Sequence, residues 1–219
     1  MLSMKERSSF SLPDQKGQGK SLELGRQIVV FMGPEGSGKS TIAKRLAEEI
    51  GRPRIAIGDV LREIAKNPEA EYHEACRKMF EDHAYLDPGI LLDILAERFK
   101  QNDVAEGFIV DGGMRTLEEA EGLQSVLDKA DKADIPLTTV YLRIPGWMSM
   151  ERLVTGEGAR ERSDDTVDGV LSRLSNHYKN LGVRSSFIRH QENWELLQVN
   201  AMGSVDQTYS NVRKSLGAK

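Results

Sequence analysis

The fold class is indicated above all by residues 33–41, which read Gly33-Pro34-Glu35-Gly36-Ser37-Gly38-Lys39-Ser40-Thr41. It matches the pattern G-x-x-x-x-G-K-[ST] and lies between an apolar run at residues 27–32 and a helical pattern at residues 41–50. A strand before the loop and a helix after it are the context that this phosphate-binding motif requires. The alternative is a glycine-rich turn that holds no ligand, and the full match in this context argues against it.

The composition of the loop suits a bound phosphate. Glycines tolerate the backbone angles that let the N–H groups of a tight loop converge, and the N-terminus of the following helix favours an anion. Lys39 is predicted to reach the β- and γ-phosphates of a nucleoside triphosphate. Ser40, or Thr41 beside it, can offer a hydroxyl to Mg²⁺. The sequence therefore predicts a site for Mg·ATP.

Strands and helices alternate along the rest of the chain. Apolar or β-branched runs predict further strands at residues 54–57, 108–110, 138–144 and 194–199. Helical spacing or helix-start residues predict helices at residues 60–66, 71–83, 87–99, 117–130, 147–154, from Asp164 or Asp165 toward Leu181, and from Ser204 onward. This order predicts an α/β fold with a doubly wound, parallel, five-stranded sheet flanked by helices.

An acidic residue follows one of these strands directly. Asp111 ends the apolar run at residues 108–110 and precedes Gly112 and Gly113. Ligands bind at the carboxyl ends of parallel strands in open α/β sheets. A role at Mg²⁺ is therefore favoured for Asp111, and the alternative is a cap of the following turn.

Composition limits the function classes. A chain of 219 residues is long enough for one α/β domain with an inserted lid, and a net charge of -4 gives no basic field for nucleic acid. Cys76 is the single cysteine, which excludes an internal disulfide and a four-cysteine zinc site and favours a reducing cytoplasm. No apolar run approaches the roughly 20 residues that span a bilayer. The four histidines, including His177, show no ligand spacing and are interpreted as surface or packing residues.

Two polar segments interrupt the folded pattern. Residues 1–24 show no helical or strand period and are predicted to form a mobile arm, and the acidic residues within them argue against a transit peptide. Residues 155–165 carry glycines and charged side chains and are predicted to form a lid. The folded domain is therefore expected at residues 25–219.

Four blocks together resemble the adenylate kinase and nucleoside monophosphate kinase family, over residues 27–216. Residues 33–41 match its phosphate loop, 58–62 its G-D-L-L-R, 111–116 its D-G-[FY]-P-R-T, and 199–204 its segment before the last helix. The resemblance implies a P-loop NTPase fold with a helical NMP-binding insertion at residues 57–86 and a short lid without zinc. It implies a monomer that transfers the γ-phosphate of Mg·ATP reversibly to AMP.

The resemblance also assigns residues by position. Its catalytic residues fall on Lys39, Arg115, Arg152, Arg162 and Arg173. Its ATP-binding residues fall on Gly33, Pro34, Glu35, Gly36, Ser37, Gly38, Lys39, Ser40, Thr41, Arg152, Arg160 and Gly203. Its NMP-binding residues fall on Ile57, Gly58, Arg62, Tyr85, Leu86, Asp87, Gly112, Arg115, Glu119, Arg162 and Arg173, and its magnesium site on Ser40 and Asp111, largely through water.

The chain departs from the family pattern at several positions. Gly156 stands where the family has a second arginine before the lid, Ile57 where it has threonine, and Gly113-Met114 where it has an aromatic residue and proline. Glu119 replaces the glutamine that reads the acceptor base, although it can also cap the helix that begins after Thr116. Two alternatives therefore stay open: CMP, UMP or GMP as the acceptor, and a nucleotide-binding module with reduced or lost turnover.

Overall fold

The computed structural model describes residues 22–82, 84–156 and 166–217. Its five strands form one parallel sheet in the order β2-β3-β1-β4-β5. The strands are β1 (Gln27–Met32), β2 (Arg54–Ala56), β3 (Gly107–Asp111), β4 (Leu137–Arg143) and β5 (Trp194–Asn200). The order confirms the predicted doubly wound sheet, because the chain leaves the central strand β1 first toward one edge and later toward the other.

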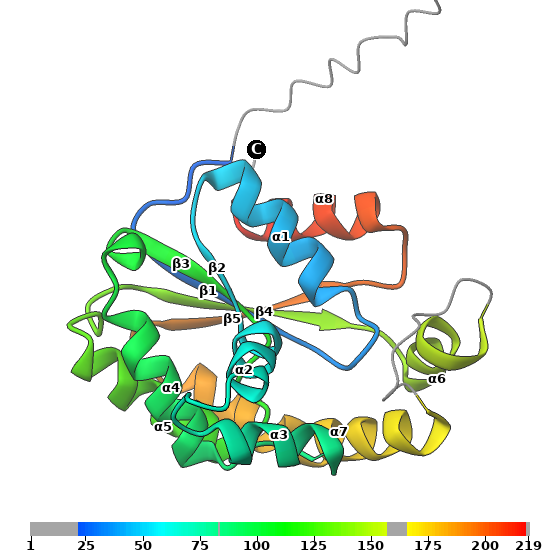
Figure 1. Ribbon diagram of the computed structural model, residues 1–219. Coiled ribbons are helices and arrows are strands. Elements are labelled where there is room, and N and C mark those ends of the chain that lie inside the picture. The colour runs from blue at the N-terminus through cyan, green and yellow to red at the C-terminus, as the bar shows by residue number, and fades with distance from the viewer. Residues whose placement is uncertain (1–21, 83, 157–165, 218–219) are drawn as a thin grey trace, which may run out of the picture.

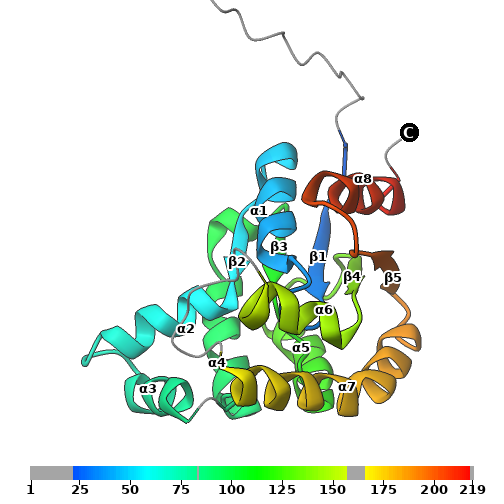
Figure 2. The same ribbon diagram turned by 90° about the vertical axis from the view of Figure 1, so that its right-hand side faces the viewer.

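Helices cover both faces of the sheet, as Figure 1 shows, with α1 and α8 on one face and α4, α5 and α7 on the other. Figure 2 shows α2 and α3 projecting beyond the sheet on one side. The helices are α1 (Lys39–Ile50), α2 (Ile57–Lys66), α3 (His73–Glu81), α4 (Pro88–Phe99), α5 (Leu117–Lys129), α6 (Gly146–Met150), α7 (Val167–Arg189) and α8 (Val205–Ser215), with a short 3₁₀ turn η1 (Asn102–Val104) and a π-helical turn η2 (Glu151–Thr155).

The apolar strands divide the core into two layers. Ile28 and Val30 of β1 pack in the cluster beneath α4 and α5, whereas Val29 and Phe31 pack in the cluster beneath α1 and α8. Successive side chains of a strand point to opposite faces, so an uninterrupted apolar run is what a strand buried on both faces requires. The second cluster also contains Leu22, whose N–H donates to Glu49. The core therefore begins inside the stretch that the sequence assigns to the arm, and residues 1–21 lie outside the described part.

The start and end of α7 differ from the sequence prediction. Thr166 caps this helix by accepting the N–H of Gly169 at 3.1 Å, so the predicted cap at Asp164 or Asp165 is wrong. The helix was expected to end near Leu181, but it continues for eight more residues, to Arg189. A glycine inside a helix costs only about 1 kcal/mol relative to alanine. Gly182 therefore does not end α7, because the helix packs against the core beyond it.

Other local predictions also needed correction. Ile57 begins α2 instead of ending a strand, because β2 stops where its partner β3 stops, at the pair Ala56 and Asp111. Cys76 is fully buried rather than half-buried. His177 is a buried residue of α7, which agrees with its interpretation as a packing residue. Within the described ranges, no helix combines the length and the apolar character needed to cross a membrane.

Candidate active site

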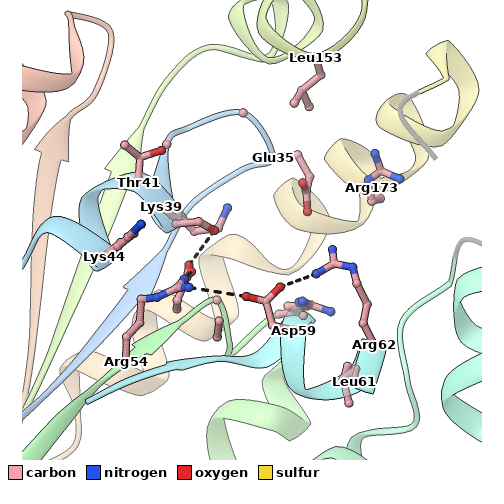
Figure 3. A pocket seen from close by; sticks show the side chains of 18 of the residues that line it. Glu35, Lys39, Thr41, Lys44, Arg54, Asp59, Leu61, Arg62, Leu153 and Arg173 are labelled. Atoms are coloured by element: carbon pink, nitrogen blue, oxygen red, sulfur yellow. Dashed lines mark hydrogen bonds and ion pairs between the residues drawn. The ribbon is translucent and has the colours of Figure 1, made fainter. Parts of the chain in front are cut away.

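A cavity of about 950 Å³ opens at the carboxyl ends of the central strands (Figure 3). The register places Phe31, at the end of β1, beside Asp111, at the end of β3, so the phosphate loop and this acid border the same space. The predicted residues that line it are Glu35, Gly36, Gly38, Lys39, Ser40, Thr41, Gly58, Arg62, Tyr85, Asp111, Gly112, Arg115, Arg152 and Arg173. Segments that are far apart in the sequence thus share one cavity.

The phosphate loop has the geometry that its glycines allow. Gly36 and Gly38 adopt φ values of 75° and 88°, a region that side chains other than glycine rarely enter. The Lys39 ammonium donates to the carbonyl oxygens of Gly33 at 2.7 Å and Pro34 at 2.9 Å. These two bonds bring the lysine back over its own loop, where its charge faces the space that the loop encloses.

Ser40 and Asp111 meet at the rim of this loop. The Ser40 hydroxyl donates to Asp111 Oδ1 at 3.2 Å, and Arg54 donates to Oδ2 of the same carboxylate. In the described part of the chain, no three His, Cys, Asp or Glu side chains gather as a metal cage. A hydroxyl beside one carboxylate suits Mg²⁺ that arrives with nucleotide phosphates, because this ion keeps several waters and takes few protein ligands.

Two of the arginines that line the cavity, both predicted to bind the acceptor, lie over aromatic rings. The Arg62 guanidinium lies 5.7 Å from the Phe80 ring centroid and donates to Asp59 at 2.7 Å. The Arg115 guanidinium lies 5.2 Å from the ring of Tyr85. An aromatic face holds a guanidinium in place without using its hydrogen-bond donors, although Asp59 already engages one donor of Arg62.

Some predicted acceptor residues have structural roles outside this cavity. Leu86 is buried in the core, and the Asp87 carboxylate caps α4 by accepting the N–H groups of Gly89 at 2.8 Å and Ile90 at 3.2 Å. Ile57 is buried and closes the space beside Gly113, where an added Cβ would lie 3.2 Å from the Ile57 side chain.

Arg152, which is predicted to bind the donor, joins the phosphate loop to the loop after β5. Its guanidinium donates to the carbonyl oxygens of Gly36 and of Ala201, each at 3.1 Å. Its distance to the carbonyl oxygen of Gly203 is 3.5 Å, so the glycine expected at the donor base lies in the same turn. Arg173 of α7 is buried and lines the same cavity, whereas Arg160 and Arg162 lie outside the described residues.

Glu119 is the residue whose environment departs most from expectation. Glu119 is 3 % exposed, and its carboxylate accepts the N–H of Arg115 at 2.7 Å rather than that of Thr116, which is the partner that a capping box would give it. The other half of the cap is confirmed, because the Thr116 hydroxyl accepts the Glu119 N–H at 3.2 Å. Burial raises the pKa of Glu119. The side chain lines a small apolar cavity next to the main one, together with Ile57 and Gly113.

Sequence reasoning missed Arg54 and Arg184. Arg184 is 1 % exposed and donates to the carbonyl oxygens of Met114 at 2.5 Å and His177 at 2.6 Å. Residues 173, 177 and 184 are buried polar positions on α7 at spacings of four and seven, which is the helical repeat that could have identified an inward polar stripe. Arg54 gave no such signal, because one charged residue in a short edge strand is ordinarily solvated.

The departure at Gly156 has a local cause. The Gly156 N–H donates to the Glu151 carbonyl at 2.8 Å and closes the π-helical turn η2. A Cβ at position 156 would lie 2.4 Å from that carbonyl oxygen, so this turn excludes the arginine of the family pattern unless the backbone moves. The prediction of one regular helix at residues 147–154 is therefore corrected to α6 followed by η2.

A phosphate loop between β1 and α1, a carboxylate at the end of β3, and arginines from both sides of one cavity define the class of ATP-dependent nucleoside monophosphate phosphotransferases. The family model described as adenylate kinase matches residues 31–191. The chain therefore belongs to the adenylate kinase family.

Curated relatives agree with this assignment over nearly their whole length. An adenylate kinase of Mycobacterium leprae is 34% identical over 190 residues, which cover 86% of this chain and 98% of the relative. An adenylate kinase of Leptospira biflexa is 33% identical over 191 residues, and one of Mycobacterium tuberculosis is 31% identical over 195 residues, with the same coverage of both chains.

Proposed function

We propose that the protein transfers the γ-phosphate of Mg·ATP to AMP, reversibly, and acts as a monomer in the cytoplasm. An oxygen of the AMP phosphate attacks the γ-phosphorus, the bond to the oxygen bridging the β- and γ-phosphates breaks, and both products are ADP. One observation carries the proposal: the Lys39 loop and the acceptor arginines Arg62 and Arg115 line one cavity. The relatives named adenylate kinase support it.

The residues assigned from the sequence take complementary parts in this proposal. Lys39 and the loop N–H groups hold the donor phosphates, and Arg62 and Arg115 hold the acceptor phosphate. Arg152 and Arg173 face the phosphoryl group between them. The attacking phosphate oxygen is already anionic near neutral pH, so positioning and charge neutralisation account for most of the catalysis.

In this proposal, residues 57–86 bind the acceptor nucleotide, and residues 155–165 act as the lid of the enzyme. Closure of a lid over both nucleotides excludes water and so prevents hydrolysis of ATP. The lid arginines Arg160 and Arg162 are assigned to the nucleotides by the resemblance to the family alone.

The magnesium site of the proposal uses Ser40 and Asp111. Their side chains lie 3.2 Å apart and offer a hydroxyl and a carboxylate oxygen at the rim of the loop, a hard oxygen set that Mg²⁺ prefers. Mg²⁺ bound with ATP neutralises charge on the β- and γ-phosphates when it is present. Asp111 would hold water on the ion, and Ser40 would offer its hydroxyl to it.

The choice of AMP depends on how Glu119 substitutes for glutamine. Adenine presents an amino donor beside an N1 acceptor, and a glutamine amide satisfies both. A protonated carboxyl also carries one donor and one acceptor, and the burial that raises the pKa of Glu119 favours this form. An ionised carboxylate has no donor, so it meets the N1 lone pair unfavourably. Glu119 therefore matches adenine only as a protonated carboxyl, and one of its oxygens already accepts the Arg115 N–H.

An acceptor panel tests the proposal. AMP, CMP, UMP and GMP are each supplied with Mg·ATP, and ADP formation is followed by a coupled assay. We expect kcat/KM to be highest for AMP. A higher value for another monophosphate would reassign the acceptor, and retained ATP binding without transfer to any acceptor would identify a nucleotide-binding module.

A further inference from the structure

Arg54 lies between the two acidic residues that border the phosphate site. It begins β2, the edge strand whose carboxyl end opens into the main cavity, and its side chain is 24% exposed. One guanidinium nitrogen donates to Asp111, and the other lies 3.6 Å from Asp59 Oδ2. Figure 3 shows Arg54 and Arg62 reaching Asp59 from opposite sides.

These contacts form one continuous chain across the cavity. Ser40 donates to Asp111 at 3.2 Å, Asp111 pairs with Arg54, Arg54 lies 3.6 Å from Asp59, and Asp59 accepts from Arg62 at 2.7 Å. The chain starts at the first turn of α1, on the donor side, and ends at the arginine assigned to the acceptor phosphate. A change at one end can therefore reach the other through charged groups in direct contact.

Both oxygens of the Asp111 carboxylate are engaged in this arrangement, one by Ser40 and one by Arg54. The Asp111 side chain is only 4% exposed, so its carboxylate interacts with these partners in a poorly screened environment. A hydrated divalent cation at Asp111 needs one of these oxygens and repels the guanidinium beside it. Cation and guanidinium thus compete for the same carboxylate.

Asp59 is the second carboxylate with which the guanidinium of Arg54 can pair. Asp59 is shared between Arg54 and Arg62, and its side chain is 60% exposed, which leaves it room to move. When Arg54 leaves Asp111, Asp59 is the acid within its reach. Arg54 faces Asp59 Oδ2 whereas Arg62 donates to Oδ1, so Arg62 is released only if the whole Asp59 carboxylate moves toward Arg54. The fork of Arg62 then becomes available to a phosphate.

We propose that Arg54 is a positioning residue that couples the metal site to the acceptor site: it occupies Asp111 before Mg·ATP binds, yields this carboxylate to the hydrated cation, and by pairing with Asp59 releases Arg62 for the acceptor phosphate. The inference rests on the metal role proposed above for Asp111. Coupling is reciprocal, so the acceptor should also strengthen cation binding by the same factor.

The test measures binding and not turnover. Mn²⁺ replaces Mg²⁺, a non-hydrolysable ATP analogue fills the donor site, and cation affinity is followed by electron paramagnetic resonance. AMP affinity is measured by calorimetry with and without the cation. The variants are Arg54→Gln, Arg54→Lys and Asp111→Asn, and Arg52→Gln is the matched control, because Arg52 lies two residues earlier and does not line the cavity.

For Arg54→Gln we expect Mn²⁺ to bind about fivefold to tenfold more tightly, tenfold being about 1.4 kcal/mol. We also expect the cation to stop tightening AMP binding. Arg54→Lys keeps the charge but loses the planar fork whose two terminal nitrogens face Asp111 and Asp59. Its Mn²⁺ affinity should therefore stay within about twofold of the parent while the coupling is lost. If Arg54→Gln does not fold, Arg54→Lys still measures whether the coupling depends on Arg54.

Three results would overturn the inference. The first is an Arg54→Gln protein with unchanged or weaker Mn²⁺ binding, and the second is one in which the cation tightens AMP binding as in the parent. The third is an effect of equal size in Arg52→Gln. If Asp111→Asn binds Mn²⁺ as the parent does, the proposed metal site itself fails. Weakened binding in Asp111→Asn with no change in Arg54→Gln rejects the role of Arg54 alone.

Discussion

Arg184 donates a 2.5 Å hydrogen bond from Nη1 to the carbonyl oxygen of Met114, 70 residues earlier in the chain. Met114 adopts a φ of 49°, in the left-handed region, which costs a residue other than glycine roughly 1–2 kcal/mol. The bond fixes the turn between Gly112 and Arg115, which carries one of the acceptor arginines. Through this bond, helix α7 supports the turn that carries Arg115.

Replacement of this buried arginine should loosen that turn. Arg184→Met leaves the Met114 carbonyl without its donor, and an unsatisfied buried polar group costs about 1–3 kcal/mol. We expect a fall of that size in the free energy of unfolding, measured in urea, together with a raised KM for the acceptor. Arg189→Met, at the exposed end of the same helix, should show neither change. Equal stability of the two variants would show that Arg184 does not hold the turn.

Lys39 should contribute to turnover more than to folding. Lys39→Ala removes a charge that faces the donor phosphates and leaves the core intact, so kcat should fall by far more than tenfold, which is about 1.4 kcal/mol of barrier. Circular dichroism should report an unchanged fold. Lys129→Ala, on the exposed end of α5, serves as the control for removal of a lysine charge. Activity of Lys39→Ala within tenfold of the parent would contradict the assignment.

Glu119→Gln separates a base-reading role from a capping role. Glutamine can keep the bond to the Arg115 N–H, and its amide has a donor and an acceptor at every pH. We expect kcat/KM to shift toward AMP over CMP and GMP, within about 5- to 150-fold, as a mismatch of roughly 1–3 kcal/mol allows. Unchanged ratios among the monophosphates would identify Glu119 as a cap alone.

The same substitution should alter how stability depends on pH. Because burial raises the pKa of Glu119 in the folded state, its stabilising contribution is present at low pH and is lost as the pH rises through the folded pKa. The amide does not ionise. The variant should therefore gain stability relative to the parent as the pH increases, which urea unfolding at several pH values would measure.

His177 should make the fold sensitive to acid. Burial, followed by the charges of Arg184 and Lys39, lowers its pKa to about 3, although Glu35 acts in the opposite direction. A depressed pKa means that protonation favours the unfolded chain, so stability is lost as the pH falls below 6.5 toward 3. Integration over one proton gives a loss of about 2 kcal/mol between pH 7 and pH 5.

The measurement compares urea unfolding of the parent and of His177→Gln at these two pH values. The substituted protein should lose about 2 kcal/mol less than the parent, and the carboxylates common to both proteins cancel in the difference. His190→Gln, which removes an exposed imidazole after the same helix, is the matched control. Equal acid sensitivity of the parent and His177→Gln would show that the imidazole is not buried in its neutral form.

The fold class, the phosphate loop and the order of the elements could be predicted from the sequence. The motif at residues 33–41 and the apolar runs around it are local signals, because a loop of glycines and a two-sided strand each require particular residue types at fixed spacing. The capping box at Ser204 was likewise readable, and the structure has both of its bonds.

The pairing of charged residues could not be predicted from the sequence, because it depends on how the elements pack. Arg54 and Asp111 lie 57 residues apart, and their ion pair exists because β2 and β3 are neighbours that end together in register. Glu119 was ambiguous between two roles, since its burial and its bond to the Arg115 N–H depend on the turn around Met114 and on α7 packed behind it. Side-chain charge is written in the sequence, but desolvation and pairing depend on distances that the folded chain alone sets.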